Sequence, residues 1–233
     1  MEVSIVVPAY NEQENLPKLI KNLAGLKASL KDFEIVIVDD NSSDKTGSLA
    51  NSYSRRYDNI RVVHRGKGIN GMGAALKEGT KIAGGKYIVW VMADNSDDLA
   101  AIPKFVGKLK NNFDMVFGSR YIKGGSRGDL SAFKAILSSG YSFAAGLIFG
   151  FKAHDITNAF RAFKKEIFNN MALESNNFAI SPEFAIRAHL KGYKLGEVPT
   201  TYRNRKAGAS KFRLIKMGAA YCRLFKYRFN WVD

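Results

Sequence analysis

The run Phe33-Glu34-Ile35-Val36-Ile37-Val38 leads directly into Asp39-Asp40-Asn41-Ser42-Ser43-Asp44, and this junction decides the fold. A short apolar run that ends in a cluster of polar, turn-forming residues is typical of a buried strand. Asp44 can then cap a helix that continues to about Tyr57. A buried strand that leads through a polar loop into a helix indicates an α/β architecture.

The same pattern recurs on both sides of this junction. We expect further strands at 3–7, 60–63, 87–92 and 114–117, and further helices at 12–26, 73–82 and 99–109. Strands that alternate with helices predict an open, mainly parallel sheet with helices on both faces, as in a Rossmann-like fold. Because ligands of such sheets bind at the carboxyl ends of the strands, the polar clusters at 10–12, 39–43 and 94–98 should meet at one edge.

The second half of the chain follows a different pattern. It predicts helices at 131–151, 181–190 and 211–225, with strands at 159–163 and 194–198. The chain has 233 residues without a repeat or a linker, so we expect a single domain over residues 1–233. Its two halves are residues 1–118 and a second lobe formed by residues 119–233.

The charge balance limits the partners. Lys and Arg number 36 against 21 Asp and Glu, a net charge of +15, which favours nucleic acid, anionic lipid or phosphorylated substrates. The N-terminus lacks a basic region followed by an apolar one, so we expect a cytoplasmic protein. The uncharged stretch 135–151 is interrupted by serine and glycine, and we expect it to pack in the core or to lie on a membrane surface rather than to span one.

Two acidic clusters carry the predicted chemistry. Asp39 and Asp40 directly follow an apolar strand, where carboxylates are costly unless bonded, and they suit a base N–H and ribose hydroxyls. The cluster 94–98 offers acidic and neutral oxygens to a hard cation, Mg²⁺ or Mn²⁺, that could bridge a nucleotide diphosphate. It can also cap the next helix. The glycine-rich turn that begins at Gly71 is expected to let backbone approach a diphosphate or a nucleoside.

These segments together resemble family 2 glycosyltransferases of the GT-A fold, and most of all the dolichol- or polyprenol-phosphate sugar synthases. The resemblance covers nearly the whole chain, and its seven motifs occur in the family's order. They are Val7-Pro8-Ala9-Tyr10-Asn11-Glu12, the segments 38–46 and 71–79, Gly118-Ser119-Arg120-Tyr121, Asn158-Ala159-Phe160-Arg161-Ala162-Phe163, Glu197-Val198-Pro199, and 205–211.

The resemblance implies an inverting transfer of a hexose, such as mannose or glucose, from a GDP- or UDP-linked donor to a polyprenyl or dolichyl phosphate. It assigns nucleoside contacts to Pro8, Tyr10, Glu12 and Asp39, and the second position of a D-x-D metal motif to Asp94. It places Arg120 at the acceptor phosphate, and Arg205, Ser210 and Lys211 on a mobile loop over the donor diphosphate. In this chain Met92 occupies the first position of the motif, where the family has an aspartate. Asp97 or Asp98 could serve as the metal ligand in place of that aspartate.

The nature of the acceptor decides which groups catalysis needs. A phosphate is already ionised at neutral pH, so the protein must orient it and offset the repulsion between phosphates. The cations suited to this are Arg120, Lys134, Arg205 and Lys211. A sugar hydroxyl in a polysaccharide or glycolipid would instead require a carboxylate base, for which Glu183 is the candidate.

The sequence leaves two other classes of function as alternatives. Because Met92 replaces the first aspartate of the metal motif, one alternative is a protein that binds a nucleotide sugar without transferase activity. Nucleic-acid binding is disfavoured, because carboxylates at the strand ends would repel phosphates. Cations alternate with bulky apolar residues over 211–228, which predicts reversible docking on the cytoplasmic face of an anionic membrane, with a membrane-anchoring partner as the alternative.

Overall fold

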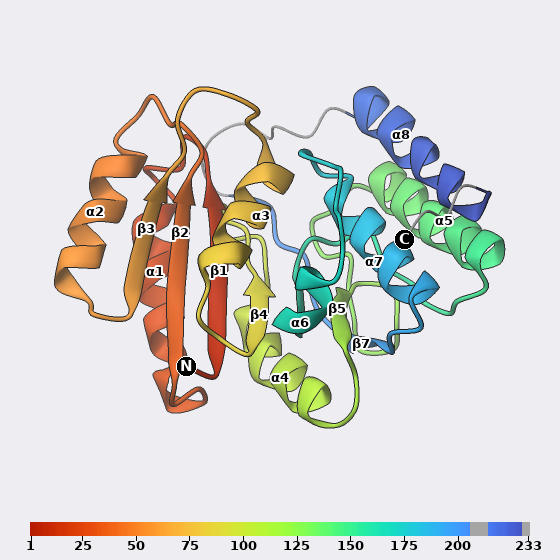
Figure 1. Cartoon of the computed structure of the whole chain (residues 1–233), viewed down its shortest axis with the longest axis horizontal. Helices are drawn as coiled ribbons and strands as arrows, with labels where there is room; N and C mark the ends of the chain where they lie inside the picture. The colour runs from red at the N-terminus through yellow and green to blue at the C-terminus, as the bar shows by residue number, and fades with distance from the viewer. Residues whose placement is uncertain (206–213, 230–233) are drawn as a thin grey trace.

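The computed structural model describes residues 1–205 and 214–229, and its seven strands form one sheet (Figure 1). The strands are β1 (Val3–Ala9), β2 (Phe33–Asp39), β3 (Ile60–His64), β4 (Tyr87–Trp90), β5 (Met115–Ser119), β6 (Arg161–Lys164) and β7 (Leu195–Pro199). Their order across the sheet is β3-β2-β1-β4-β6-β5-β7. β6 is antiparallel to β4 and β5, and the other pairings are parallel. The expected open, mainly parallel sheet is therefore confirmed.

The register brings the expected polar clusters to one edge. β1 and β2 pair from Val3 opposite Phe33 to Ala9 opposite Asp39, so their carboxyl ends lie level. Every residue of β2 is buried, which accounts for its apolar run 35–38, while the buried Glu34 accepts hydrogen bonds from Ser4 and Gly84. The loops after β1, β2 and β4 consequently start side by side.

Helices cover both faces of the sheet, as its alternating pattern predicts. One face packs against α1 (Leu16–Ala24), α2 (Thr46–Arg56) and α4 (Ile102–Lys110). The opposite face packs against α3 (Met72–Ile82), α5 (Ala132–Phe149), α6 (Lys165–Asn169), α7 (Ile180–Leu190) and the 3₁₀ turn η3 (Leu224–Arg228). Short 3₁₀ turns η1 (Gly25–Ala28) and η2 (Leu99–Ala101) extend α1 and precede α4.

Two predicted helices have different limits in the structure. α1 begins at Leu16 rather than at residue 12, because 11–15 form a loop that bonds to the β2 loop. The basic helix expected over 211–225 is described from Leu214 as α8 (Leu214–Arg223) and continues as η3. Residues 206–213, at its expected start, lie outside the described part of the chain.

The long apolar helix α5 packs on the sheet with one side only and is otherwise exposed. It begins at Ser131, whose side chain accepts the Lys134 amide, and ends at Gly150 in the left-handed conformation. Its mean hydropathy is 1.3, and only 22% of it is buried. Among the described residues, α5 is the one helix long and apolar enough to cross a membrane by length and composition. Figure 1 shows α5 beside α8 at the end of the molecule opposite α2 and β3.

Candidate active site

The loops after β1, β2 and β4 share one backbone feature. Asn11, Asn41 and Asn95 have positive φ angles of 54°, 62° and 60°. Asparagine tolerates this left-handed conformation better than most residues do. Each loop therefore turns sharply, which keeps Glu12, Asp39 and Asp94 near the ends of their strands.

Hydrogen bonds join the β1 loop to the β2 loop. Asn11 Oδ1 accepts the Ser43 amide at 2.8 Å, and the Glu12 amide donates to Thr46 Oγ1 at 2.8 Å. Asp44 accepts the amides of Thr46 and Gln13 at 2.8 Å and 3.2 Å. These bonds, with burial working against them, lower the pKa of Asp44. Asp44 precedes the N-cap position of α2, which Lys45 occupies without a side-chain cap bond, so the predicted cap is wrong in its detail; Asp44 instead binds the Thr46 amide and links the two loops.

Four residues predicted to contact the nucleoside lie along this edge. Pro8 is part of β1, opposite Val38. The Tyr10 side chain is exposed, whereas Glu12 and Asp39 are buried. The structure thus brings two carboxylates and one accessible ring close to the same pair of strand ends.

Asp39 has a partner that the sequence did not suggest. Its Oδ1 accepts the Ser42 amide at 3.1 Å, and its Oδ2 lies 3.0 Å from Nδ1 of His64 at the end of β3. Since β2 and β3 pair in parallel with Asp39 opposite His64, the pairing of these strand ends brings the two together.

Asp40 and Gly71 are placed differently from the sequence expectation. Asp40 Oδ1 pairs with Arg65, and its Oδ2 accepts the Gly71 amide at 2.7 Å. The Ala74 amide donates to the Asn176 carbonyl, and a Cβ on Gly71 would meet that same oxygen. Asp40 therefore holds the start of α3, and the glycine turn accommodates protein backbone where we expected a diphosphate.

The loop after β4 holds the candidate metal ligands. Asp94 Oδ1 accepts the Ser96 amide at 3.0 Å, while Asp97 reaches back to accept the Met92 amide at 2.7 Å. Burial raises the pKa of Asp97 to about 8, and the neighbouring Asp94 and Asp98 also raise it. A divalent cation would favour the ionised form of such a crowded carboxyl, so this donor set fits a metal.

The number of protein ligands is small. In the described residues, no group of three His, Cys, Asp or Glu side chains is arranged to hold a metal ion. Mg²⁺ is commonly bound by one or two carboxylates together with substrate phosphates. We therefore expect Asp94 and Asp97 to hold a cation only together with the donor diphosphate.

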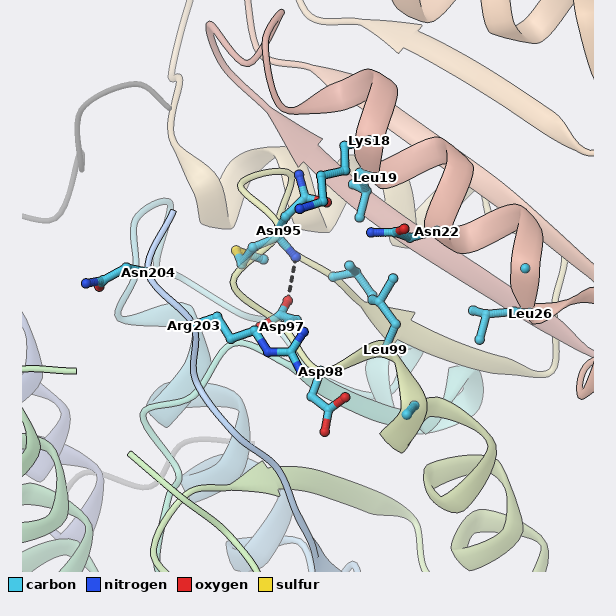
Figure 2. A pocket seen from close by; sticks show the side chains of 14 residues that line it. Lys18, Leu19, Asn22, Leu26, Asn95, Asp97, Asp98, Leu99, Arg203 and Asn204 are labelled. Carbon is cyan, nitrogen blue, oxygen red and sulfur yellow. Dashed lines mark hydrogen bonds between the residues drawn. The ribbon is translucent and has the colours of Figure 1, made fainter. Parts of the chain in front are cut away.

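A pocket of about 610 Å³ opens behind this loop, between α1 and η2. Figure 2 shows Asp97 and Arg203 near one end of its lining and Leu26 near the other. Asn95 also lines it, and its amide donates to the Asn15 carbonyl at the start of α1 at 2.9 Å. Its lining includes Asp97 and Asp98, the two candidate replacements for the first metal-motif aspartate, but none of the residues predicted to contact the nucleoside, so this pocket is adjacent to the nucleoside side of the donor site.

The segment Thr200–Arg205, here called the crossing segment, runs across the carboxyl edge of the sheet. The Thr200 amide donates to the Ser119 carbonyl, and the Arg203 amide donates to the Ser96 carbonyl at 3.1 Å. Arg205 then donates to Glu12 Oε1 at 2.7 Å. Burial and the nearby Asp94 raise the pKa of Tyr202. The crossing segment thus connects the loops after β5, β4 and β1.

Arg120, predicted to meet the acceptor phosphate, is held by a buried carboxylate. Asp155 is fully buried and accepts the Arg120 amide, Nε at 2.7 Å and Nη2 at 2.6 Å. Burial alone would lower the pKa of Arg120, but the bonds to Asp155 raise it above its usual value. Arg120 is consequently a fixed cation. Lys134 is exposed in the first turn of α5.

Asp155 and Arg161 were missed by sequence reasoning, although both lie in or beside a quoted motif. Arg161 is fully buried and donates to the carbonyls of Ile156, Asn158 and Ser181. Burial lowers its pKa to about 9, and Asp155 partly offsets this. An arginine within the apolar strand β6 was the available signal. Arg161 fixes the loop that carries Asp155.

Glu183, the candidate base for a hydroxyl acceptor, is fully buried. Its two oxygens accept the amides of Glu174 and Ser175, both at 2.7 Å, and Oε1 also accepts the Tyr227 hydroxyl at 3.2 Å. Arg187 lies 3.3 Å from the same oxygen. Glu183 therefore holds the 174–177 loop and η3 against α7. Ser210 and Lys211, the remaining predicted site residues, lie outside the described residues.

Comparisons with known proteins place this geometry in a family. The sequence model described as "Glycosyl transferase family 2" matches residues 4–171. The dolichol-phosphate mannosyltransferase of Pyrococcus furiosus is 35% identical over 216 residues, which are 91% of this chain and 60% of that protein. The polyprenol monophosphomannose synthase of Mycolicibacterium smegmatis is 29% identical over 214 residues, or 89% and 79% of the two chains. The chain thus spans less than two thirds of the Pyrococcus protein.

Solved structures confirm the fold. Glucosyl-3-phosphoglycerate synthase from Mycobacterium tuberculosis, in complex with phosphoglyceric acid, superposes with a TM-score of 0.69 at 19% identity, covering 97% of this chain and 79% of that one. The complex of the same enzyme with Mn²⁺, uridine diphosphate and phosphoglyceric acid gives 0.68 at 20% identity, covering 100% and 80%. The expected GT-A fold is therefore present, and the chain belongs to glycosyl transferase family 2.

Proposed function

We propose that this protein transfers a sugar from a nucleotide-linked donor to a polyprenyl phosphate. The observation that carries the proposal is the convergence of buried carboxylates and fixed cations at one edge of the sheet. The crossing segment links the loop of Asp94 to the β1 loop, where Arg205 meets Glu12. The names of the Pyrococcus and Mycolicibacterium relatives, which refer to dolichol phosphate and polyprenol, support the lipid phosphate as the acceptor.

The residues divide the work by their chemistry. In this proposal Asp39, Glu12 and Tyr10, on the loops after β1 and β2, receive the nucleoside, and Asp94, on the loop after β4, meets the diphosphate. A divalent cation bound with that diphosphate would stabilise the charge of the leaving group, and the Mn²⁺ and UDP bound to the Mycobacterium neighbour support this cofactor. Arg120 and Arg205 would offset the repulsion between the two phosphates.

The buried position of Glu183 favours a phosphate acceptor over a sugar hydroxyl. A hydroxyl must lose its proton to a base during transfer, whereas a phosphate is already ionised. Glu183 is fully buried and its oxygens accept backbone amides, so it does not present a carboxylate to an acceptor. The geometry therefore supports the reaction that needs no base.

A transfer assay tests the proposal directly. UDP- and GDP-linked glucose and mannose are incubated with a polyprenyl phosphate, with the unphosphorylated polyprenol as the control acceptor. We expect sugar on the phosphate alone, and its transfer should stop with EDTA and resume with Mn²⁺. Equal transfer to polyprenol would indicate a hydroxyl acceptor. Nucleotide binding without any transfer would indicate a binding protein.

We also propose that α5 docks the protein on an anionic membrane surface. Phe133, Ile136, Leu137, Phe143 and Leu147 are large apolar residues and 42–70% exposed. Their helical spacing forms a stripe about 21 Å long on one side of α5, called here the α5 stripe. Lys134 of α5, Arg223 of α8 and Arg228 of η3 are exposed, and Tyr141 of α5 contacts both α8 and η3, so cations are exposed on α5 and on its two neighbours.

The basic C-terminal helix contributes less apolar surface than its sequence suggests. Met217 and Leu224 are buried, and the rings of Tyr221 and Phe225 pack against Tyr141 of α5 at centroid distances of 5.0 Å and 5.4 Å. These apolar side chains of α8 and η3 therefore pack on the protein. Among the described residues, the α5 stripe is the larger apolar surface at this end of the molecule, with Phe229 also exposed directly after η3.

Vesicle sedimentation at low and high salt tests the docking. The protein should pellet with acidic phospholipid vesicles at low salt and be released by high salt. Replacing both Phe143 and Leu147 by serine should weaken binding roughly tenfold or more, because each large side chain contributes about 1.5–3 kcal/mol on burial. Ile69→Ser is the matched control, since Ile69 is equally exposed on the other half. An equal loss in the control, or no binding by the wild type, would contradict the proposal.

A further inference from the structure

We propose that His64 is a positioning residue that holds the Asp39 carboxylate in place to recognise a ring N–H of the donor base. This inference rests on the proposed function, since it assigns Asp39 to the nucleoside. It goes further by naming the residue that orients Asp39, and through it the selection of a base that carries a ring N–H, as uracil and guanine do.

The geometry fixes which atom carries the hydrogen. His64 Nδ1 lies 3.0 Å from Asp39 Oδ2, and an ionised carboxylate only accepts, so Nδ1 donates. With the hydrogen on Nδ1, Nε2 of the neutral ring accepts, so the Asn51 side-chain amide 2.9 Å away on α2 turns its NH₂ group to Nε2 and holds the other side of the ring. Asp39 is only 6% exposed, whereas the His64 side chain is 45% exposed, so the bond is shielded on the side of the carboxylate and open to solvent on the outer side of the ring. The imidazole is thereby held at both nitrogens and directs Asp39.

The first turn of α2 leaves room for this pair. A Cβ on Gly47 would lie 2.6 Å from Asp39 Oδ2 and 3.3 Å from His64 Cε1. Because the nearer atom is the end of a side chain, an added methyl would displace the carboxylate rather than the backbone. Glycine inside a helix is otherwise unfavourable relative to alanine, so the contact gives it a specific reason to be there.

The chemistry of the bases makes the role measurable. A fixed carboxylate accepts the N3–H of uracil or the N1–H of guanine, whereas the corresponding ring nitrogens of cytosine and adenine carry no hydrogen. A site that hydrogen-bonds a ligand N–H discriminates against analogues that lack it. A loosened Asp39 should therefore lose discrimination between bases, a change that mere loss of packing would not produce.

Calorimetry with UDP, CDP, GDP and ADP in the presence of Mn²⁺ tests the role. The wild type should bind UDP more tightly than CDP, or GDP more tightly than ADP. In His64→Leu we expect this ratio to fall about tenfold, the effect of one charge-assisted hydrogen bond. His64→Asn, which can donate from a similar position, should retain most of the ratio, while Gly47→Ala should lower it as His64→Leu does.

The chain offers a matched control in His154. Its Nδ1 lies 2.7 Å from Glu197 Oε2, so it forms the same kind of pair away from the donor site. His154→Leu should leave all four affinities unchanged.

The outcomes separate this inference from the function on which it rests. If the wild type binds none of the four nucleotides, the proposed function and this role both fail. If the wild type discriminates and His64→Leu keeps the same ratio, the role of His64 alone is wrong. A parallel loss for all four nucleotides at an unchanged ratio would also overturn it, because His64 would then support the loop without directing Asp39.

Discussion

Replacing Glu183 by alanine is expected to lower the free energy of unfolding by about 3–5 kcal/mol, the usual cost of removing one partner of a buried ion pair. Glu183 is fully buried, and it accepts the amides of Glu174 and Ser175 and pairs with Arg187. Without it, these donors face a cavity. The 174–177 loop, which contacts Gly71 and Gly73 of the α3 turn, should loosen with it.

Urea unfolding followed by circular dichroism measures the effect. Glu183→Gln is the control: it keeps the shape and one acceptor oxygen, and should recover part of the lost stability. A catalytic base would behave in the opposite way, since both variants would then stay fully stable and lose turnover. That result would return Glu183 to the active site and favour a hydroxyl acceptor.

Asp94→Ala should lower turnover about a hundredfold or more, because a group that stabilises developing charge in the transition state is worth roughly two to three powers of ten. Asp94 lies in the loop after β4, and the proposed function has its carboxylate share a cation with the donor diphosphate. Initial rates of transfer over a series of Mn²⁺ concentrations measure the loss. The variant should also require much more Mn²⁺ for half-maximal rate.

Met92→Ala is the matched control for Asp94→Ala. Met92 stands where the family's first metal-motif aspartate is expected, but it contributes its backbone amide to Asp97. Alanine keeps that amide, so the rate should change only a few-fold. Equal losses of rate in the two variants would show that the loop conformation matters and the Asp94 carboxylate does not. Full activity of Asp94→Ala in EDTA would show that the reaction needs no metal ion.

The sequence predicted the sheet edge well because local signals define it. Apolar runs that end in polar clusters identify strand ends, and parallel strands bring those ends together. Asp39, Glu12 and Asp94 were found in this way. The proposed roles of these residues remain predictions, since the structure shows where they lie and not what they bind.

Long-range partners could not be read from the sequence. Asp40 looked like a ligand because its partners, Arg65 and the Gly71 amide, belong to the loop between β3 and α3. Gly71 looked like a phosphate turn because the backbone that fills it comes from Asn176. In each case a local pattern fits either a ligand or a distant part of the chain, and only the tertiary contact decides.

The position of β6 in the sheet has a consequence for how the chain folds while it is being synthesised. β6 lies between β4 and β5, and β5 pairs only with β6 and β7 among the described strands. A nascent chain emerging from the ribosome therefore presents β5 before any partner strand exists for it, while the edge of β4 stays open. Unpaired edges of this kind promote association with other chains. Co-translational folding of this chain should consequently stall at β4 until residues 161–164 have left the exit tunnel.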